Sequence, residues 1–177
     1  GVVTASVSPE TLGTGGRSLT LITRDDLARL PVSALTDIFR LVPSVEVRAR
    51  GPRGVQADFA IRGAGFNQAL VLLNGVRLND AQSGHHSAAI PVALLDVERV
   101  ELLLGGGASV HGADAFGGAI NVITRRAGPR FTADLSIGQH GLVEAAAAVS
   151  LSGRPGAHVV SAEFNRSTGF APDRDHD

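Results

Sequence analysis

The chain has 177 residues, enough for one ordinary domain with a hydrophobic core and for part of a second. Its 16 basic and 17 acidic side chains nearly cancel, which argues against a general nucleic-acid binder because phosphate neutralisation needs a basic surplus. Every basic residue is Arg and there is no Cys, so a P-loop or Schiff-base lysine, a thiol nucleophile and disulfides are excluded. The 22 Gly residues indicate a chain rich in turns and strands.

The chain begins at Gly1 and contains no Met, so we interpret it as a processed or excised segment. No apolar run reaches the roughly 18 residues that a transmembrane helix requires. Residues 1–17 are small and polar without a sustained apolar period, and they are predicted to form a flexible leader.

A strand and two short helices are predicted to follow the leader. The strand covers Leu19–Thr23, and Thr23 is expected to cap a helix that ends before Pro31. Ser33 is expected to cap a second helix that Pro43 stops, and its apolar residues have helical spacing: Leu35, Ile38, Phe39 and Val42.

From Val45 to Thr124 the pattern favours strands joined by Gly-rich turns. Strands are predicted at Val45–Arg48, Asp58–Arg62, Ala69–Leu73, Val97–Leu104 and Ala119–Thr124. Asn74–Gly75 fits a two-residue hairpin turn in which both residues have positive φ. A polar loop is expected at Asn79–Ala89, and a short helix opened by Pro91 at Ile90–Leu95.

Beyond Pro129 three segments alternate apolar and polar residues with a period of two. Each is about ten residues long, the spacing of membrane β-strands, although an ordinary antiparallel meander would look the same. Such strands alone would leave open edges and one uncovered apolar face. We therefore interpret this region as the beginning of a larger structure.

Four motifs follow one another in the middle of the chain. They are DFAIRG at 58–63, VLLNGVRLN at 71–79, IPVALLDVERVE at 90–101 and GADAFGGAINVIT at 112–124. In order and spacing they resemble the plug domain of TonB-dependent outer-membrane receptors, most closely the vitamin B12 receptor branch. The resemblance implies an α+β fold: a flexible leader at 1–17, a small mixed-sheet plug with short helices at 18–127, and at 128–177 the first antiparallel strands of a barrel with about 22 strands.

The resemblance also implies a function. Such a receptor binds a scarce solute, for example vitamin B12, siderophore-bound iron or haem, and imports it with energy transmitted by TonB. It lies in the bacterial outer membrane, with lipid around the barrel and the plug inside the lumen, and it performs no covalent chemistry and needs no cofactor. The first five residues resemble the second half of the Ton box, so Val2, Val3, Thr4 and Ala5 are expected to pair with TonB as an added strand.

Three loops, here called the apical loops, would face the outside in the resembling family. Their candidate substrate-binding residues are Arg53, Phe66, Asn67, Gln68, Gln82, Ser83, His85 and His86. Solvated loop residues are the plainer interpretation. A metal site is not expected, because two neighbouring His on extended backbone point in opposite directions and a third ligand is missing.

Arg62 and Glu101 are the candidate plug–barrel contacts, since a guanidinium can make two charge-assisted bonds to barrel carboxylates. A solvated arginine at a strand end is the alternative for Arg62. The sequence departs from the family at Leu104, where an Arg is usual, and at His111, where a Tyr is usual. Locking of the plug by two arginines is therefore in doubt.

Two other classes of protein are alternative interpretations of the sequence. The main alternative is a soluble α+β module, such as a periplasmic binding module or a secretin-type interaction module, which would be monomeric, unfold cooperatively and need no detergent. An enzyme using the Gly-rich loops is poorly supported, because Gly63-Ala64-Gly65 lacks the third glycine of a dinucleotide motif and no Gly-x-Ser-x-Gly occurs. The alternating acids Asp173, Asp175 and Asp177 lack the glycine and glutamate of a calcium loop.

Overall fold

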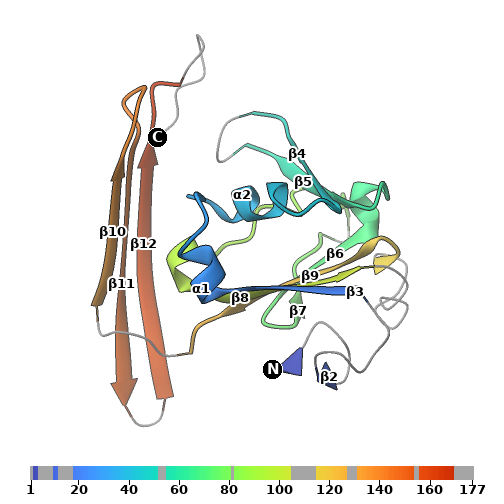
Figure 1. Ribbon diagram of the computed structural model, residues 1–177, viewed down its shortest axis with the longest axis horizontal. Coiled ribbons are helices and arrows are strands. Elements are labelled where there is room, and N and C mark those ends of the chain that lie inside the picture. The colour runs from blue at the N-terminus through green and yellow to red at the C-terminus, as the bar shows by residue number, and fades with distance from the viewer. Residues whose placement is uncertain are drawn as a thin grey trace.

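The computed structural model describes residues 2–3, 10–11, 18–51, 55–80, 82–104, 115–126, 131–153 and 156–169. It contains a plug, built on a mixed sheet with short helices, and a separate sheet of three long strands that stands beside it (Figure 1). The predicted α+β class with a small mixed sheet is confirmed. Among the described residues, no helix is long and apolar enough to cross a membrane.

The plug sheet has five strands in the order β3-β8-β9-β6-β7. β6 and β9 are parallel and the other neighbours are antiparallel. The strands are β3 (Ser18–Thr23), β6 (Ala69–Leu73), β7 (Val76–Arg77), β8 (Val97–Leu104) and β9 (Gly118–Thr124). Asn74 and Gly75 both have positive φ, 52° and 82°, so the predicted two-residue hairpin between β6 and β7 is confirmed.

Two short helices cover one face of this sheet together with a hairpin. α1 (Arg24–Leu27) begins at Thr23, whose hydroxyl accepts from the Asp26 N–H while the Asp26 carboxylate accepts from Thr23, so the predicted cap is confirmed. α2 (Leu35–Arg40) begins at Ala34, so the prediction that Ser33 caps it was wrong. The Asp37 carboxylate accepts the backbone N–H groups of Ser33 and Ala34, and this makes a serine cap unnecessary.

The hairpin of β4 (Val45–Ala49) and β5 (Ala57–Ile61) packs with α2 over the plug sheet (Figure 1). The main core lies between these layers, where Phe39 of α2 meets Phe59 of β5 edge-on with ring centroids 4.6 Å apart. β5 ends at Ile61, one residue earlier than predicted, because Arg62 turns the chain with a φ of 53°. A 3₁₀ turn, η1 (Phe66–Gln68), then leads into β6.

The predicted helix at Ile90–Leu95 is not formed, and only a 3₁₀ turn, η2 (Leu94–Asp96), is present. The residues before it are extended; Ala93 has a φ of −65° and a ψ of 142°. Ile90, Val92 and Leu94 alternate along this extended segment and all three pack against the main core. The alternation of apolar residues, which favours extended backbone, therefore determines the local structure, and Pro91 does not start a helix here.

The separate sheet, here called the wall sheet, is an antiparallel meander of β10 (Phe131–Ile137), β11 (Val143–Gly153) and β12 (Gly156–Arg166). Register places Phe131, Val149 and Val160 in one row and Leu135, Ala145 and Phe164 in another. Both rows lie on the same face of the wall sheet. All the large exposed apolar side chains of the three strands lie on this face: Phe131, Leu135, Ile137, Val149, Leu151, Val160 and Phe164. The rows between them are more polar and face the plug, as expected for the first strands of a membrane barrel.

In the predicted leader, the structure describes two short strands, β1 (Val2–Val3) and β2 (Glu10–Thr11). They pair antiparallel, with Val2 opposite Thr11 and Val3 opposite Glu10. The backbone of Val2 and Val3 thus adopts the extended form that strand addition requires.

Gly118 opens β9 with a φ of 151°, and a Cβ there would lie 2.6 Å from the Leu103 carbonyl oxygen. Gly118→Ala should therefore lower the free energy of unfolding by about 2–4 kcal/mol, because backbone cannot move aside cheaply. Urea unfolding of the chain in detergent micelles measures the change. Gly153→Ala is the control, since a Cβ there meets no atom within 4 Å, and a loss as large as that of Gly118→Ala would contradict the argument.

Candidate functional site

Two of the predicted apical loops are joined to each other by aromatic stacking. Phe66 belongs to the loop at 63–68, here called the first apical loop, and His85 to the loop at 79–89, here called the second apical loop. Their rings are 4.2 Å apart and nearly parallel at 19°. Gly84 has a φ of 66°, which favours glycine, and a Cβ there would be in van der Waals contact with the Asn67 Cβ at 3.4 Å, so the two loops lie close together. Phe66, Asn67 and His85 therefore share one surface.

A buried carboxylate of β5, that of Asp58, also holds His85 in place. Its Nδ1 lies 3.0 Å from Asp58 Oδ2, and Gln56 donates to the same oxygen at 3.0 Å. Burial would raise the pKa of Asp58, but hydrogen bonds from His85, Gln56 and the backbone of His86 outweigh it and hold that pKa below its ordinary value. Asp58 is thus a carboxylate that positions the second apical loop.

The second apical loop is also ordered by bonds of its own. Asp80 accepts from the Ser83 hydroxyl at 2.6 Å and from the backbone N–H groups of Gln82 and Ser83. At the other end of the loop, Ser87 accepts the Phe59 N–H at 2.9 Å. Gln82 and Ser83 remain exposed, so the loop presents them on a prearranged backbone.

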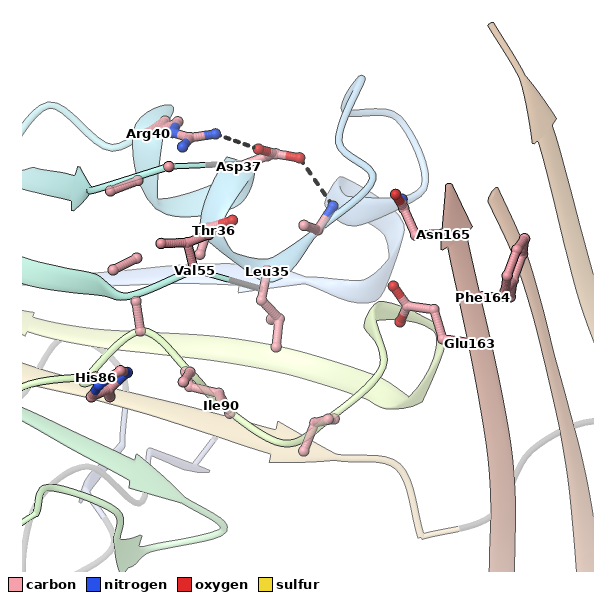
Figure 2. A pocket seen from close by; sticks show the side chains of 17 residues that line it. Leu35, Thr36, Asp37, Arg40, Val55, His86, Ile90, Glu163, Phe164 and Asn165 are labelled. Atoms are coloured by element: carbon pink, nitrogen blue, oxygen red, sulfur yellow. Dashed lines mark hydrogen bonds and ion pairs between the residues drawn. The ribbon is translucent and has the colours of Figure 1, made fainter. Parts of the chain in front are cut away.

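His86 lines a cavity of about 630 Å³ between the plug and the wall sheet (Figure 2). Its φ of 62° is uncommon for a residue with a side chain and turns the chain between the two His residues. The backbone at His86 is therefore not extended, and the two His residues lie in different environments. His85 is held by Asp58 and Phe66, while His86 is exposed.

The cavity is lined by both apolar and polar side chains. Leu35, Val55 and Ile90 contribute apolar surface from three segments of the plug. Glu163 and Asn165 of β12 point toward α2, and Phe164 between them points to the opposite side of the strand (Figure 2). Asp37 and Arg40 form an ion pair of 2.8 Å on the α2 side. This volume and this mixture of surfaces are typical of a small-molecule site.

The two candidate plug–barrel residues lie in different environments. Arg62 is exposed at the end of β5, beside Gly63 and Phe116. Glu101 is 0% exposed in β8, where Arg99 donates to it at 2.9 Å and Asn121 at 3.2 Å. The carboxylate of Glu101 is therefore bonded within the plug.

Several predicted residues lie outside the described part of the chain: Thr4, Ala5, Arg53, the region 105–114 that contains His111, and the acids after residue 170. For Val2 and Val3 the structure describes the strand they form. The described ranges contain no group of three or more His, Asp or Glu side chains arranged to hold a metal ion.

Sequence reasoning missed Asp58, Gln56 and Asp80 as supports of the site, and Asp37 and Arg40 as cavity residues. Asp58 carried a usable signal, because an acid inside an otherwise apolar strand must find a hydrogen-bonding partner. Asp37 and Arg40 carried none, since an acid and a base three residues apart occur on many solvated helices.

The chain is similar to known proteins both in sequence and in fold. The family model for the TonB-dependent receptor plug domain matches residues 13–119. The vitamin B12 transporter BtuB of Vibrio vulnificus is 40% identical over 123 residues, which are 70% of this chain and 20% of that protein. The chain thus spans about a fifth of the length of this relative.

Solved receptors share the fold at lower identity. The pyoverdine outer-membrane receptor FpvA of Pseudomonas aeruginosa aligns with 96% of this chain and 25% of its own, at 19% identity and a TM-score of 0.72. The siderophore receptor PiuA of Acinetobacter baumannii aligns with 92% of this chain and 22% of its own, at 22% identity and a TM-score of 0.67. These likenesses concern the fold alone.

The chain belongs to the plug-domain family of TonB-dependent receptors. The predicted family is confirmed, and so is the placement in the outer membrane, with the plug inside a barrel. The named relatives are transport receptors and not enzymes.

Replacing Asp58 tests whether a carboxylate holds the second apical loop. Asp58→Asn should lower the free energy of unfolding at neutral pH by about 1–2 kcal/mol, because the bonds that lower the Asp58 pKa favour its charged form. A depressed pKa gives stability that is complete above the unfolded value, near 3.8, and is lost as the pH falls through the lower folded value. The difference between the two proteins should therefore shrink below about pH 4, and urea unfolding at pH 7 and pH 3 measures it. A difference that does not depend on pH would contradict this role.

Proposed function

We propose that this chain is the energy-coupled gate of an outer-membrane importer for a scarce solute. The observation that carries the proposal is the plug placed beside strands whose polar face turns toward it and whose apolar face turns away. Seven large exposed apolar side chains on one face suit a lipid environment. They also weigh against the alternative of a soluble periplasmic or secretin-type module, which would leave them in water.

The division of the chain is part of the proposal: a leader at 1–17, a plug at 18–127 and the start of a barrel at 128–177. The last strand of the plug sheet ends at Thr124 and the wall sheet begins at Phe131, which supports the second boundary. We propose that Arg62 contacts barrel carboxylates, because it is exposed at the end of β5. Glu101 would act only indirectly, by fixing β8 to β9.

The cargo would meet the apical loops first and then the cavity behind them. His86 supports this path, because it belongs to the second apical loop and lines the cavity. Vitamin B12 is the first cargo to test, since the relative with 40% identity is a vitamin B12 transporter. Binding and transport would need no covalent chemistry in this chain.

We propose that the leader is the contact for TonB. Val2 and Val3 already form a strand, and an extended terminus can add to the edge of a partner's sheet through its main-chain hydrogen bonds. Force applied there would reach the plug at β3, the first strand after the leader. Partial opening of the plug would then free a path for the cargo.

Val3→Pro should abolish uptake of cyanocobalamin by cells while leaving binding at the surface intact. Proline removes the N–H that an added strand needs, and Val3 is not a residue of the apical loops. Val3→Ala is the matched control, because it keeps the N–H and should retain most of the uptake. Undiminished uptake by Val3→Pro would reject strand addition.

His86→Asn should raise the Kd for cyanocobalamin about tenfold, as expected for the loss of one well-placed polar contact. Asn tolerates positive φ, so the substitution leaves the backbone unstrained. His158→Asn is the control, since His158 pairs with Leu151 on the apolar face of the wall sheet. Titration calorimetry measures both, and equal affinities for His86→Asn and the unchanged protein would remove His86 from the cargo site.

A further inference from the structure

The boundary between the plug and the wall sheet, here called the seam, contains two cavities that share one side chain. The first is the cavity beside α2 described above. The second, of about 480 Å³, lies between α1, η2 and the three wall strands. Glu163 of β12 lines both cavities (Figure 2). A solute that moved along the seam from one cavity to the other would pass this carboxylate.

A second carboxylate lies level with Glu163 on the same face of the wall sheet. Asp134 of β10 and Glu163 are both paired with Ala146 of β11, so the three residues form one row across the sheet. Neighbouring strands are about 4.8 Å apart, which places Asp134 and Glu163 roughly 10 Å from each other with only a methyl side chain between them. Asp134 also lines the second cavity. Asp134 and Glu163 are here called the seam acids.

The seam acids carry charges that nothing in the described part of the chain neutralises. Neither acid forms an ion pair with a described Arg or His side chain. The Ser136 hydroxyl donates to Asp134 at 3.5 Å, and this contact leaves the charge in place. Both acids therefore contribute a full negative charge to the seam at neutral pH.

The arginines that line the cavities are engaged elsewhere. In the first cavity Arg40 pairs with Asp37 at 2.8 Å, so these two charges cancel. In the second cavity Arg24 donates from Nη1 to the carbonyl oxygens of Leu95 at 3.1 Å and Val97 at 3.0 Å, which belong to the plug. Among the described residues that line the second cavity, acids outnumber this arginine by three to one.

The plug contributes apolar surface to the second cavity, from Leu27, Leu30 and Leu94. A cleft that combines charges of one sign with low-dielectric walls concentrates the electric field. The seam acids therefore produce a stronger potential in the cavities than the same two carboxylates would produce on an open surface.

We propose that the seam acids form an electrostatic barrier to anions: they give both cavities a negative potential that disfavours anionic solutes and favours neutral and cationic ones. Its meaning for the cargo rests on the import function proposed above. A cargo without net charge, such as cyanocobalamin, would be accepted, whereas a ferric chelate with a net negative charge would be disfavoured. The barrier thus separates cargo classes that the apical loops leave open.

Charged thiol reagents measure this potential directly, because the chain contains no Cys. Ala89→Cys places a thiol in the first cavity and Ala28→Cys in the second, and both alanines are exposed. The full chain in detergent micelles is modified with cationic trimethylammonioethyl methanethiosulfonate and with anionic sulfonatoethyl methanethiosulfonate. The ratio of the two rates on one thiol cancels its thiolate fraction, and it is compared with the ratio for free mercaptoethanol.

Relative to mercaptoethanol, the cationic reagent should react about fivefold faster than the anionic one at both positions in about 0.1 M salt. The preference should fall to about twofold in about 0.5 M salt, because dissolved ions screen the carboxylates. Glu163→Gln should reduce it about twofold at both positions, since Glu163 lines both cavities. Asp134→Asn should act mainly on Ala28→Cys, because Asp134 lines only the second cavity.

Glu98→Gln is the matched control, because Glu98 is an exposed acid of the plug that lines neither cavity. It should change neither ratio. Ratios equal to that of mercaptoethanol at both positions would overturn the proposal, and so would an effect of Glu98→Gln as large as that of Glu163→Gln. The measurement involves neither cargo nor TonB. A failure here therefore leaves the import proposal standing, and a failure of uptake leaves the measured barrier standing.

Discussion

The wall sheet requires different surroundings on its two faces, and the rest of the structure depends on this requirement. Register aligns the large apolar side chains in rows across all three strands, so the apolar face is continuous. The opposite face carries Glu144, which accepts from Asn165 across the strands at 2.7 Å, and it lies against the plug. A sheet of this kind is stable only with lipid on one side, a wet interior on the other, and further strands at its open edges.

The plug, in contrast, has a hydrophobic core of its own, and each of its buried carboxylates joins two elements. Asp58 joins β5 to the second apical loop, Asp96 joins η2 to the end of β9, and Glu101 joins β8 to β9. A buried charge is costly without a partner, so each of these acids specifies one arrangement of the elements around it. These three contacts lie within the plug.

The fold could be predicted from the sequence because its signals are local. Thr23 and Asp26 form a capping box, Asn74 and Gly75 form a hairpin turn, and the alternation after Pro129 sets the faces of the wall sheet. The errors came where tertiary contacts override local rules. Asp37 replaces Ser33 as the cap of α2, and packing of Ile90, Val92 and Leu94 on the core keeps that segment extended. The candidate site was predicted as a set of loops. The sequence indicates that Asp58 needs a hydrogen-bonding partner, but it does not identify His85 as that partner, because the two are 27 residues apart.

The two adjacent His residues show how a loop can serve both stability and binding. The stacking of His85 on Phe66 and its contact with Asp58 fix the loop, so less conformational entropy would be lost when the proposed cargo binds. The left-handed backbone at His86 then directs the next side chain into the cavity beside α2. A loop held at one residue and free at the next can recognise a ligand on one side while it transmits the contact to the strand beneath it. Because β5 carries Asp58 at one end and leads to Arg62 at the other, that strand is a direct physical link between the apical loops and the exposed edge of the plug.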